Sequence, residues 1–218
     1  MPKLARSVVV RPWVKIALLT LIMIAILGWW GLWRHSSQPE MIERQLTSNS
    51  SENSVTSMAL SRDGANLAYA DKAGVFIKSI RTGETHQVAL PPNFSASVDG
   101  WFPDESHLLV SRAERPGNAG LWSVSVFGGS LRKLADDASG GSFSPDGSHI
   151  AFHRGDLTYD GLWGREEWVM RSDGTDPVKV APARADAPQV GTPTWSPDGT
   201  RIAYIRSTLG VQRANEFR

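Results

Sequence analysis

The residues that come nearest to a metal site by type and spacing are two histidines and two aspartates. His149 and His153 lie four residues apart in a segment with strand periodicity, so they would share one face of a strand about 13 Å apart. That separation is too large for one metal ion, and we expect an exposed pair of ordinary histidines. Asp156 and Asp160 could bind a hard cation, but the glycines beside them also fit a solvated loop.

A nucleophile for hydrolysis is equally hard to find. A hydrolase elbow requires Gly-x-Ser-x-Gly, which exposes a strained serine. Ser130 and Ser142 each follow two glycines, but no glycine closes either motif. The sequence contains no cysteine, no His-Glu-x-x-His pair and no Walker-type loop. We therefore predict no catalytic, cofactor-binding or metal-binding residues, and no cofactor.

Four aspartates recur at one place in a repeated motif, at intervals of 41, 42 and 52 residues: Asp63, Asp104, Asp146 and Asp198. The motif is Ser-Pro-Asp-Gly or a variant, with Arg62 in place of proline in the first repeat and Glu105 in place of glycine in the second. Proline fixes φ for a turn, aspartate bonds its own downstream backbone, and glycine accepts positive φ. Because these aspartates occur once per repeat, we interpret them as turn formers.

Short strands surround each of these turns. An apolar residue ends one strand before the turn, and an alternating strand such as 150–152 or 202–204 follows it, with two further strands after that. Four short antiparallel strands every ~40–50 residues are typical of a β-propeller blade. A β-sandwich, the alternative, does not predict one turn motif at every fourth strand. We expect the tryptophans at 122, 168 and 195 to lie in the core.

The fold prediction is thus an all-β, incomplete β-propeller over residues 54–218, with three full four-stranded blades plus part of a fourth, preceded by one transmembrane helix. An open ring exposes blade faces and sheet edges. We expect either that the chain is the front part of a longer protein, or that self-association or another chain completes the ring.

The first 53 residues predict a membrane anchor. Residues 1–34 carry a charge of +5 and the remainder carries −4, which excludes a nucleic-acid-binding surface. The eighteen uncharged residues 16–33 would form a helix of roughly 27 Å, close to the ~30 Å hydrocarbon core. We predict a short basic cytoplasmic segment (1–15), a transmembrane helix in contact with lipid (16–33) and a polar tether (34–53). The positive-inside rule then gives a single-pass protein of the bacterial inner membrane with a periplasmic propeller; a cleavable signal peptide is the alternative.

The segments 144–152 and 196–204, which read Ser-Pro-Asp-Gly-x-x-Ile-Ala-aromatic, resemble the WD40-like repeats of TolB-type β-propellers. The resemblance extends over residues 42–218. It implies a non-enzymatic, membrane-anchored binding or sensor module of a bacterial signalling or regulatory protein, with a protein or peptide partner at the propeller face. Two alternatives stay open: a TolB-like envelope scaffold, and a non-catalytic propeller fragment of a prolyl-oligopeptidase-like hydrolase.

Overall fold

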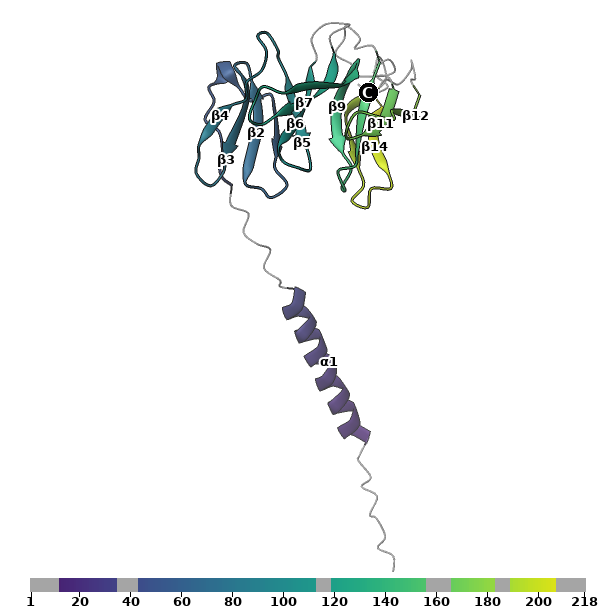
Figure 1. Cartoon of the computed structure of the whole chain (residues 1–218). Coiled ribbons are helices and arrows are strands. Elements are labelled where there is room, and N and C mark those ends of the chain that lie inside the picture. Colours follow the sequence, from purple (N-terminus) through teal and green to yellow (C-terminus); the bar gives the residue numbers. More distant parts are fainter. Residues whose placement is uncertain (1–11, 35–42, 113–118, 156–165, 183–188, 207–218) are drawn as a thin grey trace, which may run out of the picture. The chain divides into compact units, whose positions relative to one another are not determined.

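The computed structural model describes residues 12–34, 43–112, 119–155, 166–182 and 189–206. The chain divides into two compact units, Met1–Gln45 and Leu46–Arg218. The first contains a helix and the second contains all of the strands. We describe each unit by itself (Figure 1), and the predicted boundaries at residues 15, 33 and 53 stay predictions.

The helix α1 (Pro12–Arg34) begins at a proline, which suits the first turn because its missing N–H would have no partner there. Among the helical residues that the structure describes, no segment is both long enough and apolar enough to span a bilayer.

The predicted location in the bacterial inner membrane, as a single-pass protein with a cytoplasmic N-terminus and a periplasmic propeller, is therefore wrong by this finding. The predicted lipid contact through residues 16–33 depended on the same span and loses its support with it.

The second unit consists of three four-stranded antiparallel sheets and one two-stranded sheet (Figure 1). Within each sheet the strands follow one another in sequence order. Blade 1 contains β1 (Ser57–Leu60), β2 (Asn66–Asp71), β3 (Gly74–Ser79) and β4 (Thr85–Gln87). Blade 2 contains β5 (Ser97–Trp101), β6 (His107–Arg112), β7 (Gly120–Ser125) and β8 (Leu131–Asp136). Blade 3 contains β9 (Ala138–Phe143), β10 (His149–Arg154), β11 (Glu166–Arg171) and β12 (Val178–Ala181), and blade 4 contains β13 (Gln189–Trp195) and β14 (Ile202–Arg206).

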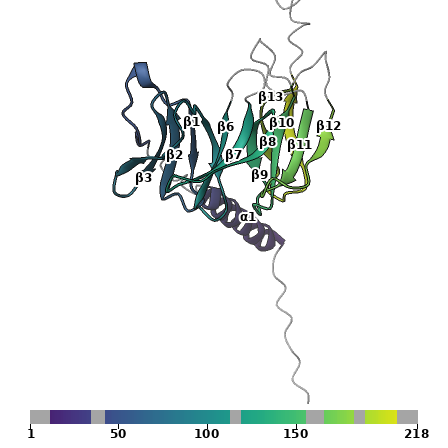
Figure 2. The ribbon, with the colours of Figure 1, turned by 45° about the horizontal axis from the view of Figure 1, so that its top comes forward.

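The sheets stack face to face, and among the described strands none pairs with a strand of a neighbouring sheet (Figure 2). The first strand of each blade packs beside the first strand of the following blade, β1 by β5, β5 by β9 and β9 by β13. These are the inner strands of a propeller. The prediction of three full blades plus part of a fourth is confirmed, and the sandwich alternative is excluded.

Blade 2 is buried on both faces, because alternate residues of its strands enter two separate cores. Leu108 and Val110 belong to a cluster shared with blade 1, whereas Leu109 belongs to a cluster shared with blade 3. Each fully buried side chain of this kind contributes about 1.5–3 kcal/mol. Trp122 and Trp168 pack against these clusters, as expected from the sequence.

The third of those tryptophans has a different role. Trp195 lies at the end of β13 and its Nε1 donates a hydrogen bond to the Ser142 carbonyl of blade 3, at 3.1 Å. Trp101 does the same two blades earlier, donating from blade 2 to the Ala59 carbonyl of blade 1 at 3.0 Å. Indole side chains at the ends of two inner strands therefore tie blade 2 to blade 1 and blade 4 to blade 3.

The repeated aspartates close the turns, as the sequence predicts. In blade 3, Asp146 Oδ1 accepts hydrogen bonds from Ser144 Oγ at 2.6 Å and from the Ser148 N–H at 3.0 Å. The same pair of bonds recurs in blade 1 around Asp63 and in blade 4 around Asp198. These carboxylates are engaged in holding the backbone, which confirms that they are turn formers.

Candidate functional site

Because the strands of a blade alternate in direction, its connections lie at two ends. The repeated aspartate turns lie at one end, which we call the turn end. The other end, the loop end, carries the β2–β3 turn (residues 72–73) and the β4–β5 connection (residues 88–96). The polar network, the buried ion pair and the two cavities described below belong to this loop end or to the strand segments next to it.

Bulges interrupt the inner strands near the loop end. The ladder between β5 and β6 skips Asp99, and the ladder between β9 and β10 skips Gly140 and Gly141. A bulge releases backbone and side-chain groups from the ladder and re-aims them. Gly140 has a φ of +63°, and a Cβ on Gly141 would lie 2.5 Å from Leu109 Cδ2, so both positions require glycine.

The released groups form a polar network between blades 2 and 3. Ser111 Oγ donates to Asp99 Oδ2, and the Gly141 N–H donates to the same oxygen at 3.3 Å. The Gly140 N–H in turn donates to Ser111 Oγ at 3.0 Å. Desolvation raises the pKa of the Asp99 carboxyl to about 7, although the bonds from Ser111 and Gly141 act in the opposite direction. A carboxyl that titrates near neutral pH thus joins two blades.

The expectation of an exposed histidine pair is wrong for His153. Its side chain is 1% exposed and its Nδ1 lies 3.0 Å from Glu167 Oε2, whose side chain is fully buried. A Cβ at Gly140 would lie 3.3 Å from His153 Cδ2 and 3.4 Å from Thr192 Oγ1. Strand periodicity correctly places His149 and His153 on one face, but it does not reveal that β13 packs over that face.

The other candidate ligands, Asp156 and Asp160, lie outside the described residues. In the described ranges, no three histidine or acidic side chains are grouped so that they could hold a metal ion. Ser130 and Ser142, the serines of the incomplete elbow motifs, lie in a β7–β8 turn and on β9.

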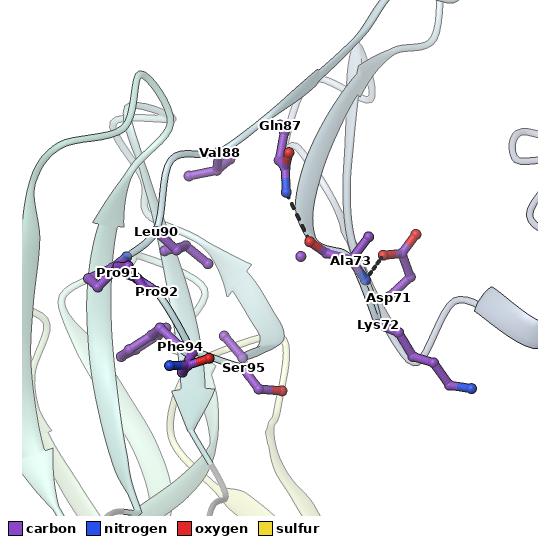
Figure 3. A pocket seen from close by; sticks show the side chains of 13 residues that line it. Asp71, Lys72, Ala73, Gln87, Val88, Leu90, Pro91, Pro92, Phe94 and Ser95 are labelled. Carbon is purple, nitrogen blue, oxygen red and sulfur yellow. Dashed lines mark hydrogen bonds between the residues drawn. The ribbon is translucent and has the colours of Figure 1, made fainter.

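A cavity of about 510 Å³ lies between the β2–β3 turn and the β4–β5 connection (Figure 3). One wall is apolar and carries Leu90, Pro91, Pro92 and Phe94. The facing wall is polar and contains Asp71, Lys72 and Ala73, with the Gln87 amide donating to the Ala73 carbonyl at 2.9 Å. We call this cavity the groove.

The Asp71 carboxylate of the polar wall is engaged within the protein. Its Oδ1 accepts the Ala73 N–H at 2.7 Å, and its Oδ2 accepts the side-chain amides of Asn49 at 2.8 Å and Asn53 at 3.0 Å. These bonds also attach the chain before β1 to the loop end.

A second cavity of about 270 Å³ adjoins the groove and shares Asp71, Lys72, Ser95 and Ala96 with it. Its remaining lining is rich in hydroxyl groups, from Thr56, Ser97 and Ser111. Ser111 links this cavity to the network around Asp99. The loop end therefore presents an apolar recess beside a hydroxyl-lined one.

Sequence reasoning missed the groove because it contains no repeated motif. The signal that could have revealed it is the connection between the first two repeats, which contains Pro91-Pro92 and Asn93. Asn93 has a φ of +62°, a conformation that non-glycine residues rarely adopt.

Comparison with known proteins identifies similar chains. No protein-family model matches. The Tol-Pal system protein TolB of Anaeromyxobacter dehalogenans is 35% identical over 117 residues, which are 52% of this chain and 24% of that protein. A structure identified provisionally as TolB from Agrobacterium tumefaciens gives a TM-score of 0.62 at 18% identity, over 77% of this chain and 58% of the other. An oligogalacturonate lyase in complex with manganese gives 0.56 at 19% identity, over 76% and 50%.

The chain therefore has a TolB-type propeller fold and TolB-like homologues in both sequence and structure. It spans about a quarter of the length of the curated TolB proteins that it matches.

Proposed function

We propose that this chain is a TolB-like scaffold that binds a segment of a partner protein at the loop end of its propeller, without catalysis. The observation that carries the proposal is the groove between the β2–β3 turn and the β4–β5 connection. Its volume of about 510 Å³ is within the roughly 300–1,000 Å³ of ligand-binding clefts. Connections at the end of a rigid scaffold are also where proteins most often place their binding residues.

The relatives support this scaffold function better than a sensor. Three of the curated matches are named as TolB proteins of a Tol-Pal system. The lyases that share the fold are less than 20% identical to this chain, so they support the architecture alone.

Site-specific photo-crosslinking tests the proposal in the intact chain. Ser95 is exposed and lines both cavities, whereas Thr82 is exposed in the β3–β4 turn at the opposite end of the same blade. A photoreactive residue at position 95 should give a discrete protein adduct in cells of the source organism, and the same residue at position 82 should not.

The substitution Ser95→Tyr, combined with a photoreactive residue at Pro92, should abolish the adduct because the tyrosine ring would occupy the groove. Adducts that form equally from positions 82 and 95, or adducts unaffected by the tyrosine, would contradict binding at the loop end.

A further inference from the structure

We propose that the groove selects an extended protein segment in which apolar side chains alternate with acidic ones. This inference rests on the proposed function, because it names the chemistry of the partner that the same site would bind. It depends on the different character of the two walls and on the one charge that the polar wall leaves unneutralised.

The apolar wall is held rigidly. Phe94 is 8% exposed, and its ring contacts Trp122 edge-on at a centroid distance of 5.4 Å. The Arg112 guanidinium lies 4.9 Å from the centroid of the same ring, and its Nη2 donates to the Asn93 carbonyl at 3.3 Å. Pro91 and Pro92 are exposed beside Phe94, so the wall offers a fixed apolar surface to a side chain.

The polar wall carries one acid and one base, and they are not equivalent. Three donors within the protein engage the Asp71 carboxylate. No ion pair found among the described residues includes the Lys72 ammonium. Lys72 is exposed, and it lines both the groove and the hydroxyl-lined cavity.

The charges near the site therefore favour an anion. Lys72 is cationic, and among the described residues that line either cavity the one acid is the engaged Asp71. The Ser95 and Ser97 hydroxyls of the second cavity can donate further hydrogen bonds to a carboxylate, whereas those of Thr56 and Ser111 already donate within the protein. A basic segment would meet the like charge of Lys72 there.

The geometry also specifies the conformation of the bound segment. Lys72 projects from the β2–β3 turn on the side away from Phe94 (Figure 3). The apolar and the acidic side chain must therefore leave the partner's backbone in different directions. Successive side chains of an extended chain point to opposite sides, so neighbouring residues of a strand-like segment satisfy both walls.

Peptide binding to the full-length chain tests the inference. The probes are three fluorescein-labelled peptides of equal length: Gly-Leu-Glu-Leu-Glu-Gly, its lysine counterpart Gly-Leu-Lys-Leu-Lys-Gly, and Gly-Ser-Glu-Ser-Glu-Gly, which keeps the acids but lacks the apolar side chains. Fluorescence anisotropy should show saturable binding of the first peptide alone. Binding of the lysine peptide with equal affinity, or absence of binding by the first peptide, would overturn the proposal.

Charge-reversal variants of the protein test the role of Lys72. Lys72→Glu should weaken binding of the leucine–glutamate peptide by roughly tenfold, since it replaces an attraction by a repulsion. Arg81→Glu changes the net charge by the same amount but lies in the β3–β4 turn at the other end of blade 1, so it should leave the affinity unchanged. Equal losses in the two variants would show a nonspecific field effect and overturn the assignment to the groove.

The two proposals can fail separately. Suppose that adducts from position 95 persist in the Lys72→Glu chain and that the acidic and basic peptides bind with equal affinity. The scaffold function would then stand, and the preference for acidic side chains would be refuted. Loss of the adducts from position 95 would remove the scaffold function itself.

Discussion

Glu105 Oε1 accepts a hydrogen bond from the backbone N–H of Arg62 in the preceding blade, at 3.0 Å, and lies 3.4 Å from the N–H of Asp63. Both residues depart from the repeated motif, since Arg62 replaces its proline and Glu105 replaces its glycine. In the next pair of blades the same place holds Pro103 against Gly147, where a Cβ would lie 2.1 Å from the proline Cγ. The two departures are thus the two sides of a single contact between neighbouring blades.

This relationship predicts thermodynamic coupling between positions 62 and 105. Arg62→Pro removes the N–H that Glu105 accepts, and we expect it to lower the free energy of unfolding by about 1–2 kcal/mol. Glu105→Gly removes the acceptor but relieves the backbone strain of a non-glycine residue with a φ of +54°. The double variant restores the proline–glycine contact, so it should be more stable than the sum of the single effects by about 1 kcal/mol. Urea unfolding of the four proteins measures the coupling, and strictly additive effects would contradict it.

Stability should depend on pH through Asp99. Its pKa is raised by desolvation from an ordinary value of 3.8 to about 7, so folding favours the protonated carboxyl. This contribution is fully present below pH 3.8 and is lost as the pH rises through 7, so the free energy of unfolding should fall over that interval. Asp99→Asn should flatten the profile between pH 5 and 8 and stabilise the protein at pH 8.

The turn aspartates should not produce a loss of stability with rising pH. The hydrogen bond from the Ser144 side chain contributes most to lowering the pKa of Asp146 to about 2. Asp146 therefore stabilises the fold above its unfolded-state pKa, and this stabilisation is lost as the pH falls toward 2, whereas that of Asp99 is lost as the pH rises. Urea unfolding midpoints from pH 5 to 8 measure the Asp99 effect. A profile of Asp99→Asn that runs parallel to that of the parent would refute the assignment.

The buried pair between β10 and β11 should be sensitive to the loss of either partner. His153 and Glu167 are almost completely enclosed, so His153→Ala should leave the buried Glu167 side chain without its neighbour. We expect a loss of about 3–5 kcal/mol, as is usual when one member of a buried pair is removed. His149→Ala, on the same face of β10 but partly exposed, is the matched control and should change stability by less than about 0.5 kcal/mol. Equal effects of the two substitutions would show that the ion pair has no special role.

Each indole hydrogen bond between blades should make a measurable contribution to the free energy of unfolding. Trp101→Phe keeps an aromatic ring but removes the Nε1–H that donates to the Ala59 carbonyl, so we expect a loss of about 1 kcal/mol. Trp195→Phe should behave alike, because its Nε1–H donates to the Ser142 carbonyl. Blade 3 has Phe143 at the same place, which shows that the ring alone fits. Thermal unfolding of the two variants measures the effect, and unchanged midpoints would contradict it.

The propeller was predictable because its blades are encoded locally. Each Ser-Pro-Asp-Gly turn fixes its own geometry through bonds within five residues, so the repeat in the sequence becomes a repeat in space. Interactions between blades were not predictable in this way. The burial of His153 depends on β13, and the pairing of Arg62 with Glu105 depends on distances between turns 43 residues apart.

The groove and the membrane anchor were misjudged for different reasons. Residues 88–96 follow no repeat, so only the packed structure shows that Phe94 and Lys72 line a common cavity. The anchor was predicted from the uncharged run of residues 16–33 and the basic residues before it, and the described helix does not support it.

Amide hydrogen exchange of the full-length chain, with and without the leucine–glutamate peptide, tests the central claim most directly. The account predicts slower exchange in the β2–β3 turn and in residues 88–96 when the peptide is present, with no change in the aspartate turns around Asp104 and Asp146. Protection confined to those turns, or no protection anywhere, would contradict a binding site at the loop end.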